Sequence, residues 1–333
     1  MGTKINHISY FLPSKTLSNE ELSVEFSDHT PEQIFKKTGV KTRTHTTPDQ
    51  IGSDMAFLAA EKLFLDSSLN KQDIGFLVYV TEGLDYKAPA TAGILQDRLR
   101  LPLNIGAIDV PLGCSGFTHA LGISKMIIES GQADNVLLLF GDTPSFVSHP
   151  KDFVLRSLFS DAGAAIWVGK SDNNSIGNFI YGSDGSGAKN LFVDQSSTRN
   201  PLDHKWLDNN DDANGMLYGQ MKMDGLEIFT FSLKRVPLLV NDILEKNKLS
   251  IEDIDLFVFH QASNIILKSI QRKLKIPDDR MAYYLEDFGN TVSISIPIAL
   301  SESIKEGRVK KGSKVLVAGF GIGYSWSGTV LYY

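Results

Sequence analysis

The pattern of the segment GCSGFTHALGISKMIIESGQADNVLLLFG (113–141) occurs twice in the chain and indicates its fold. It opens on a glycine-containing turn, continues with small and apolar residues at helical spacing, and ends in an apolar strand that closes on glycine. The stretch GNTVSISIPIALSESIKEGRVKKGSKVLVAGFG (289–321) repeats this order roughly 180 residues later. We therefore expect two similar halves in which strands alternate with helices.

A second pair of segments supports the same division. LNKQDIGFLVYVTEG (69–83) is matched by LSIEDIDLFVFHQAS (249–263), and each follows a stretch with helical periodicity. The first half is predicted to span 1–180 and the second 181–333. Strands that are apolar throughout are typical of central strands covered on both faces. The expected central strands are 76–80, 136–140, 256–259 and 314–320.

Composition limits the class of protein. Of the 333 residues 42% are hydrophobic and 22% are charged, with a net charge of −6, which is ordinary for a globular protein and does not favour nucleic acid as a partner. No window reaches the roughly 20 apolar residues of a membrane span, and the N-terminal stretch has no signal-peptide pattern. The single cysteine excludes an internal disulfide and a cysteine-rich metal site. We expect a cytoplasmic protein without a metal or cofactor.

Two further stretches are interpreted as binding neither a metal nor a dinucleotide. The polar stretch 182–222 is rich in Gly, Asn and Asp, and it is interpreted as loops and a surface excursion. Its residues Asp208, Asp211 and Asp212 are interpreted as part of a solvated loop rather than a metal site. The glycines of GFGIGYSWSG (319–328) lack the G-x-G-x-x-G spacing and the following helix of a dinucleotide loop.

Three polar residues stand where expected strands end. Cys114, the only cysteine, lies between an expected strand (105–110) and an expected helix (116–130). His260 follows the apolar run LFVF, and Asn290 takes in the second half the place that Cys114 takes in the first. Because ligands of open α/β sheets bind outside the carboxyl ends of the strands, a two-fold relation between the halves would bring the three together.

Cys114 is the predicted nucleophile. A helix N-terminus favours negative charge, so we expect a lowered thiol pKa, and the flanking glycines let a substrate approach closely. Taken singly, Cys114 fits a small buried apolar residue, His260 a buried hydrogen-bonded side chain, and Asn290 a turn or helix cap. The prediction of a site therefore depends on the combination. The nucleophile-elbow pattern fails because position 112 is Leu.

With these motifs in place, the chain resembles the β-ketoacyl-[acyl-carrier-protein] synthase III family of the thiolase-like superfamily over nearly its whole length. DVPLGCSGF, HQAS, FGNT and GFGIGYSWSG resemble the family's signatures in order and spacing. The resemblance implies an α/β, five-layer αβαβα fold of two similar halves, each with a five-stranded sheet. It implies a decarboxylative Claisen condensation between an acyl primer held on Cys114 and malonyl-loaded acyl carrier protein.

The resemblance also implies roles for single residues. His260 and Asn290 would hydrogen-bond the malonyl thioester oxygen, where negative charge builds as the enolate forms. The backbone N–H groups of Cys114 and Ile322 would form a second oxyanion hole for the acyl oxygen. The family's Phe that crosses the dimer interface aligns with Ala88, and a smaller residue there would admit a longer or bulkier acyl chain. The acyl pocket is expected at Ala88 and Phe320.

Departures from the family leave the acyl donor open. Where the family holds the CoA adenine between a Trp and an Arg, this chain has Gln33 and Phe153. The primer is therefore expected from either acyl-CoA or an acyl carrier protein. Arg272 and Lys273 fit a docking patch for the acidic carrier protein, and equally a solvated helix face. The family implies a homodimer, and the departures suggest a specialised pathway.

Two alternative functions remain on this fold. An acyltransferase or thioesterase would form the same acyl-enzyme on Cys114 but pass the acyl group to an alcohol, an amine or water. A non-catalytic partner in a heterodimer would need no nucleophile. The presence of both His260 and Asn290 beside the cysteine favours the decarboxylating enzyme.

Overall fold

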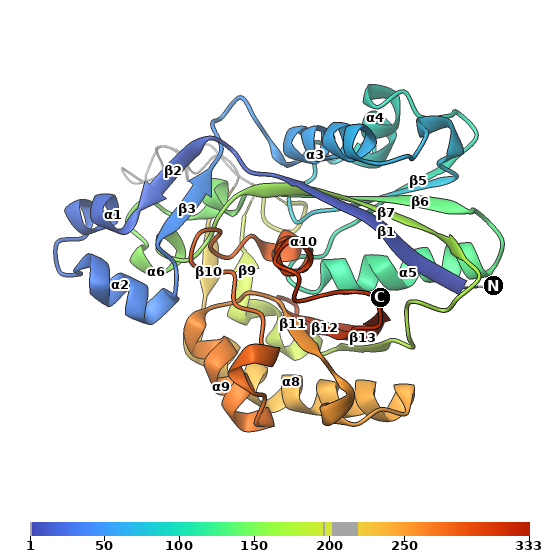
Figure 1. Ribbon diagram of the computed structural model, residues 1–333. Helices are drawn as coiled ribbons and strands as arrows, with labels where there is room; N and C mark the ends of the chain where they lie inside the picture. Colours follow the sequence, from blue (N-terminus) through green and yellow to red (C-terminus); the bar gives the residue numbers. More distant parts are fainter. Residues whose placement is uncertain (1, 196, 202–218) are drawn as a thin grey trace.

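Two sheets face each other, with helices between them and on both outer sides (Figure 1). The computed structural model describes residues 2–195, 197–201 and 219–333. The first sheet has five strands in the order β1-β7-β6-β4-β5. In chain order they are β1 (Gly2–Phe11), β4 (Phe76–Val80), β5 (Gly106–Val110), β6 (Asn135–Asp142) and β7 (Ala162–Ser171).

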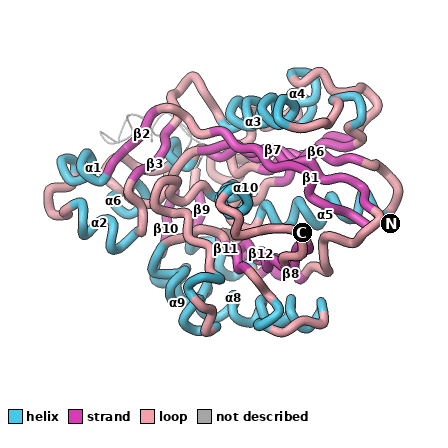
Figure 2. Tube along the Cα trace, viewed as in Figure 1, coloured by secondary structure: helices cyan, strands magenta, loops and turns pink. Residues whose placement is uncertain are grey.

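The second sheet has four strands in the described part of the chain, in the order β11-β12-β13-β8. The family resemblance implied five strands for this sheet. The described residues contain four, so the predicted number is wrong for this part of the chain. Figure 2 shows the two sheets with their strands in magenta. The strands are β8 (Ile180–Ser183), β11 (Leu256–Phe259), β12 (Lys314–Gly321) and β13 (Ser325–Tyr332).

Six helices complete the five layers. The outer face of the first sheet is covered by α3 (Gly52–Asp66) and α4 (Thr91–Arg98). The layer between the sheets consists of α5 (Gly116–Glu129) and α10 (Ser295–Lys305), which contact strands of both halves. The second sheet carries α8 (Gly225–Asn247) and α9 (Asn264–Leu274) on its outer face (Figure 1). The predicted αβαβα architecture is confirmed.

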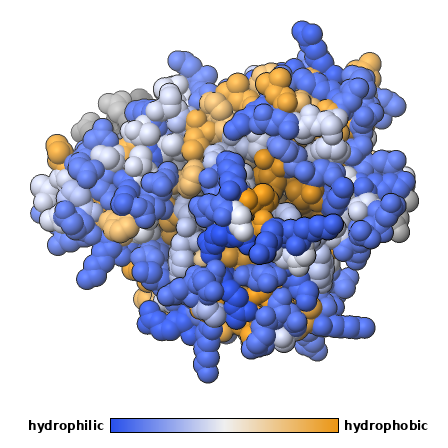
Figure 3. Space-filling view, viewed as in Figure 1, coloured by the Kyte–Doolittle hydropathy of each residue, from blue (hydrophilic) through white to orange (hydrophobic). Residues whose placement is uncertain are grey.

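The repeat in the sequence corresponds to a repeat in space. α5 runs into β6 in the first half, as α10 runs into β12 in the second. One apolar core joins the inner faces of both sheets through these two helices. Every residue of β11 is buried, as are all residues of β6 and β12 after the first, which explains why these strands are apolar throughout. The outer surface in view is mainly hydrophilic (Figure 3).

Smaller elements lie outside the two sheets. They are β2 (Lys15–Ser18), α1 (Asn19–Glu25), α2 (Pro31–Thr38), β3 (Thr42–His45) and α6 (Phe153–Arg156). The stretch 182–222 is less irregular than predicted, because β9 (Leu191–Val193) pairs with β10 (Met221–Met223). Asp208, Asp211 and Asp212 lie outside the described residues. The predicted boundary between the two halves, after residue 180, stays a prediction. It falls at the first residue of β8.

Two absences concern the described residues only. Within 2–195, 197–201 and 219–333 no helix is long and apolar enough to cross a membrane. The same ranges contain no group of three or more His, Cys, Asp or Glu side chains suited to a metal ion.

Candidate active site

Cys114 lies in the turn between β5 and α5, two residues before the helix begins. The backbone N–H groups of Ile322 and of Cys114 itself donate hydrogen bonds to the thiol. A Cβ added to Gly321 would lie 2.8 Å from the Cys114 Sγ, so the β12 end passes directly against the nucleophile. Only a residue without a side chain leaves the sulfur room at this position.

Hydroxyl groups fix the loop that carries Ile322. The Ser325 Oγ donates to the Ile322 carbonyl at 2.9 Å. The same oxygen lies 2.7 Å from the Ser115 Oγ, next to the nucleophile. Both serines are buried, so these bonds are protected from water. The arrangement holds the Ile322 N–H in a fixed direction relative to Cys114.

The thiol of Cys114 is buried and protonated at neutral pH. Burial raises its pKa to about 12, and the charges of Glu82 and Asp142 add to that rise. The two backbone N–H groups act in the opposite direction but are outweighed. The predicted lowering of the thiol pKa by the helix N-terminus is therefore wrong for the free protein. A reaction at this sulfur needs a base or a substrate that changes its surroundings.

His260 begins directly after β11 and is 1% exposed. Its backbone N–H donates to the Ala318 carbonyl of β12 at 2.9 Å, and its ring lies edge-on to Phe320 at 5.8 Å between centroids. Burial lowers the pKa of the imidazole to about 3, so the ring is neutral. The Nδ1 lies 2.8 Å from the Ser295 Oγ, at the start of α10.

Ser295 was not found from the sequence. Its hydroxyl accepts from the Gln261 backbone N–H at 3.2 Å and lies 3.0 Å from the Val292 carbonyl. The hydroxyl has one proton, which it can give either to Val292 or to the His260 Nδ1. Donation to Nδ1 places the ring proton on Nε2. Donation to Val292 would instead leave the ring proton on Nδ1, so the direction of the Ser295 bond decides which imidazole nitrogen is a donor.

Asn290 is 4% exposed and is held from both sides. Its backbone N–H donates to the Leu158 carbonyl at 2.9 Å, and its Nδ2 donates to the Ala262 carbonyl at 3.2 Å. Its Oδ1 accepts from the Val292 N–H at 3.0 Å. Because an amide nitrogen carries two protons, one donor of Asn290 remains for a ligand.

Gly289 allows this approach. It has a φ of +63°, and an added Cβ would lie 2.3 Å from the Ser160 Oγ. A side chain would thus clash and also strain the backbone. Gly289 is therefore required, because Ser160 of the first half lies directly against it.

Val292 connects the three predicted residues. It belongs to the same apolar cluster as Cys114, together with Leu155, Phe159 and Ile322. Its backbone contacts the Asn290 Oδ1 and the His260 ring. Cys114 from the first half and His260 and Asn290 from the second therefore border the same residue, Val292. Their joint role stays a prediction.

Glu82 is a second residue that the sequence analysis missed. It stands two residues after β4, the strand that repeats the one before His260. The Gly113 N–H donates to its carboxylate, and its own N–H donates to the Asp142 Oδ1 at 2.9 Å. Desolvation of the carboxylate beside the Gly113 turn raises the pKa of Glu82 to about 7, with a contribution from the charge of Asp142, although the residue as a whole is exposed in the single chain. The repeat itself, which pairs 69–83 with 249–263, was the available signal.

The two predicted acyl-pocket residues, Phe320 and Ala88, lie in different surroundings. Phe320 is buried against the His260 ring. Ala88 is exposed in the single chain, within an exposed run at 86–90. No described contact brings it to Cys114, so its role stays a prediction.

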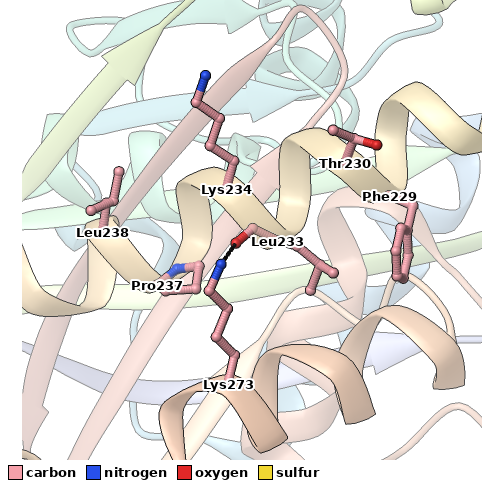
Figure 4. Close-up of a pocket in the computed structure, with 7 residues that line it drawn as sticks. All are labelled: Phe229, Thr230, Leu233, Lys234, Pro237, Leu238 and Lys273. Carbon is pink, nitrogen blue, oxygen red and sulfur yellow. Dashed lines mark hydrogen bonds between the residues drawn. The ribbon is translucent and has the colours of Figure 1, made fainter.

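The predicted docking residues lie on the outer side of α9. Arg272 and Lys273 are both exposed. Lys273 reaches toward α8, where its Nζ donates to the Leu233 carbonyl at 2.9 Å (Figure 4). It also lines an open groove of about 390 Å³ between the two helices, together with Lys234 and Phe229 (Figure 4). The groove does not contain the three site residues.

The side chains at the predicted CoA-binding positions near α2 and α6 contact one another or their own helix. Gln33 exchanges hydrogen bonds with Thr30 in the capping box of α2. The ring of His29 stacks on Phe153 at 3.7 Å between centroids. Arg156 pairs with Glu25 at 2.8 Å. The aromatic face of Phe153 is therefore covered from within the chain.

The chain is similar to known proteins of one family. Residues 108–185 match the family 3-oxoacyl-[acyl-carrier-protein (ACP)] synthase III, and residues 244–333 match its C-terminal part. The β-ketoacyl-[acyl-carrier-protein] synthase III of Caldanaerobacter subterraneus subsp. tengcongensis is 33% identical over 323 residues, which are 96% of this chain and 95% of that protein.

Solved structures give the same result. A crystal structure of a 3-oxoacyl-(acyl-carrier-protein) synthase III superposes with a TM-score of 0.95 and 36% identity over 100% of both chains. The priming β-ketosynthase from the R1128 polyketide biosynthetic pathway superposes with a TM-score of 0.87 and 28% identity, over 99% of this chain and 96% of that one.

Proposed function

Because the chain belongs to the β-ketoacyl-[acyl-carrier-protein] synthase III family of acyltransferases, we propose that Cys114, His260 and Asn290 carry out its condensation. The activity of a ketoacyl synthase of this kind is the condensation that starts a fatty-acid or polyketide chain. The observation that carries the assignment of roles is the convergence of the three side chains around Val292.

The first half-reaction loads the enzyme. The Cys114 sulfur attacks the carbonyl carbon of an acyl thioester, and the donor's thiol leaves with the proton that the cysteine loses. The negative charge on the carbonyl oxygen is stabilised by the backbone N–H groups of Cys114 and Ile322. Both N–H groups face the sulfur in the free protein, which supports this role.

The second half-reaction extends the chain. The malonyl thioester loses carbon dioxide, and the electron pair of the broken bond forms an enolate. The enolate carbon attacks the acyl carbon on Cys114, the carbon–sulfur bond breaks, and the sulfur takes up a proton. His260 and the free amide proton of Asn290 donate to the enolate oxygen as its charge develops.

A neutral His260 suits this task. Its pKa of about 3 keeps it uncharged, so it contributes a hydrogen bond rather than a proton. We assign the Ser295 hydroxyl proton to the bond with Nδ1, which leaves the Nε2 proton for the substrate. A polarised neutral donor stabilises the enolate without protonating it.

We propose that acyl carrier protein delivers the malonyl group and docks at Arg272 and Lys273. These exposed cations complement an acidic partner, and the groove beside Lys273 offers apolar surface. The primer arrives on acyl-CoA or on a carrier protein. The stacking of His29 on Phe153 favours the carrier, because it covers one face of the aromatic ring at the predicted adenine position.

The oligomer and the compartment are also proposals. A homodimer is supported by the free edge of β5, where Ile108 is 39% exposed, and by the exposed run at 86–90 beside it. In such a dimer Ala88 would border the partner's acyl pocket and admit a long or branched primer. The single free cysteine supports a cytoplasmic location. Sedimentation equilibrium at about twice the chain mass would support the dimer, and a monomer would refute it.

The function is tested by product analysis. The protein is incubated with malonyl-loaded carrier protein and a panel of acyl-CoA and acyl-carrier donors, and the products are identified by mass spectrometry. We expect a β-ketoacyl thioester that requires Cys114 and releases carbon dioxide. Transfer of the acyl group to water, an alcohol or an amine, with no malonyl-derived product across the panel, would favour the acyltransferase or thioesterase alternative.

A further inference from the structure

A carboxylate lies beside the nucleophile and has no part in the reaction described above. The Gly113 N–H donates to the side chain of Glu82, and a Cβ added to Gly113 would lie 2.8 Å from the Glu82 Oε1. The same Cβ would lie 3.0 Å from the Ile322 Cγ2. Glu82 and Ile322 therefore flank the residue that directly precedes Cys114.

The position of Glu82 is fixed by its own backbone. Its N–H donates to the Asp142 Oδ1 at 2.9 Å, and Asp142 is anchored by the Ser293 hydroxyl at 2.6 Å. The backbone of Glu82 is therefore held at the end of β4, and its carboxylate extends to the turn before α5. Its charge raises the pKa of the Cys114 thiol, as does that of Asp142.

The protonation of Glu82 suits proton transfer at neutral pH. Its pKa of about 7 results from desolvation of the carboxylate first and from the charge of Asp142 on β6 second, and the residue as a whole is exposed in the single chain, where solvent can exchange its proton. The titratable groups that face it are Asp142 and Cys114. A group whose pKa lies near the working pH both accepts and releases a proton readily.

His260 is a poorer proton acceptor. Its pKa is about 3, compared with about 7 for Glu82, so the carboxylate is the stronger base of the two. The thiol needs such a base because its own pKa is about 12. The neutral imidazole is better suited to donating a hydrogen bond in the second half-reaction.

We propose that Glu82 accepts the proton of the Cys114 thiol, directly or through one water, as the sulfur attacks the acyl donor. The carbon–sulfur bond to the enzyme forms, the bond to the donor's sulfur breaks, and the proton passes from Glu82 to the departing thiolate. No oxidant or reductant takes part, and Glu82 ends as it began. The inference rests on the proposed loading of Cys114.

The test compares Glu82→Gln with the wild type. Glu252→Gln is the control, because it also removes one carboxylate, at an exposed position. The rate of acyl-adduct formation is measured by intact mass without malonyl substrate, from pH 5.5 to 9. We expect the wild-type rate to reach a plateau above about pH 7 and Glu252→Gln to behave identically. We expect Glu82→Gln to react about 100-fold more slowly at pH 7, with a rate that rises with pH without a plateau. Glu82→Asp should restore part of the rate.

The direction of the effect separates two roles of the carboxylate. If Glu82 acted only through its charge, the neutral amide would lower the thiol pKa and the variant would react faster. An equal or faster rate in a Glu82→Gln variant with an unchanged unfolding midpoint would overturn the proposal. The same comparison with iodoacetamide needs no acyl donor. A wild type that accepts no donor refutes the proposed function, whereas the iodoacetamide rates still decide the role of Glu82.

Discussion

Replacing Asn290 with alanine separates the two half-reactions. The substitution removes the free amide proton assigned to the enolate oxygen and leaves the two N–H groups beside Cys114 in place. Loss of one donor to a developing oxyanion lowers a catalytic rate by roughly 10²–10³, or about 2.7–4 kcal/mol. We therefore expect condensation to fall by that factor while loading of Cys114 stays within about threefold of wild type.

The same change has a predictable cost in stability. The buried Val292 N–H loses its acceptor, the Asn290 Oδ1 at 3.0 Å, and an unsatisfied buried donor costs about 1–3 kcal/mol. The free energy of unfolding should fall by about that amount in a urea titration. Asn290→Asp is the matched control, because it keeps an acceptor for Val292 but removes the amide donor.

The assay follows each half-reaction on its own. Loading is measured as the acyl adduct on the intact protein. Condensation is measured by adding malonyl-loaded carrier protein to the isolated acyl-enzyme and following the β-ketoacyl product. Condensation within threefold of wild type in Asn290→Ala, or an equal loss in both half-reactions, would refute the assignment of Asn290 to the enolate.

Three further variants test other features of the chain. Ser295→Ala removes the partner of the His260 Nδ1, so we expect condensation to slow at least about tenfold, with loading little changed in the same single-turnover assay. Gly321→Ala puts a Cβ 2.8 Å from the Cys114 Sγ, so we expect no acyl adduct by mass and an unfolding free energy lower by about 1–3 kcal/mol. Exchanging Arg272 and Lys273 together for Glu should raise KM for malonyl-loaded carrier protein without changing kcat. High salt should shrink that effect; an unchanged KM at low salt would remove these residues from the docking surface.

The layers and the central strands could be predicted from the sequence because burial on both faces leaves a direct trace. β4, β6, β11 and β12 are apolar runs, and each lies where the repeat predicted it. The short pairing of β9 with β10 leaves no such trace, since a three-residue strand in a polar stretch resembles a loop.

The sequence indicated which residues form the candidate site, but it did not indicate their protonation or their hydrogen-bond partners. Cys114, His260 and Asn290 follow from strand ends and the repeat. The thiol pKa was predicted in the wrong direction, because a helix N-terminus is visible in sequence whereas the depth of burial is not. Ser295 and Glu82 were missed because each acts through a contact across the fold, with His260 and with the Cys114 turn.

The most direct test of the account is a single-turnover chase. Cys114 is loaded with an acyl group, freed of donor, and mixed with malonyl-loaded carrier protein, while the protein mass and the released thioester are followed together. We expect the adduct to disappear at the same rate as a β-ketoacyl thioester forms, and Cys114→Ala to give neither. An adduct that is lost to water at the same rate with and without the malonyl substrate would contradict it.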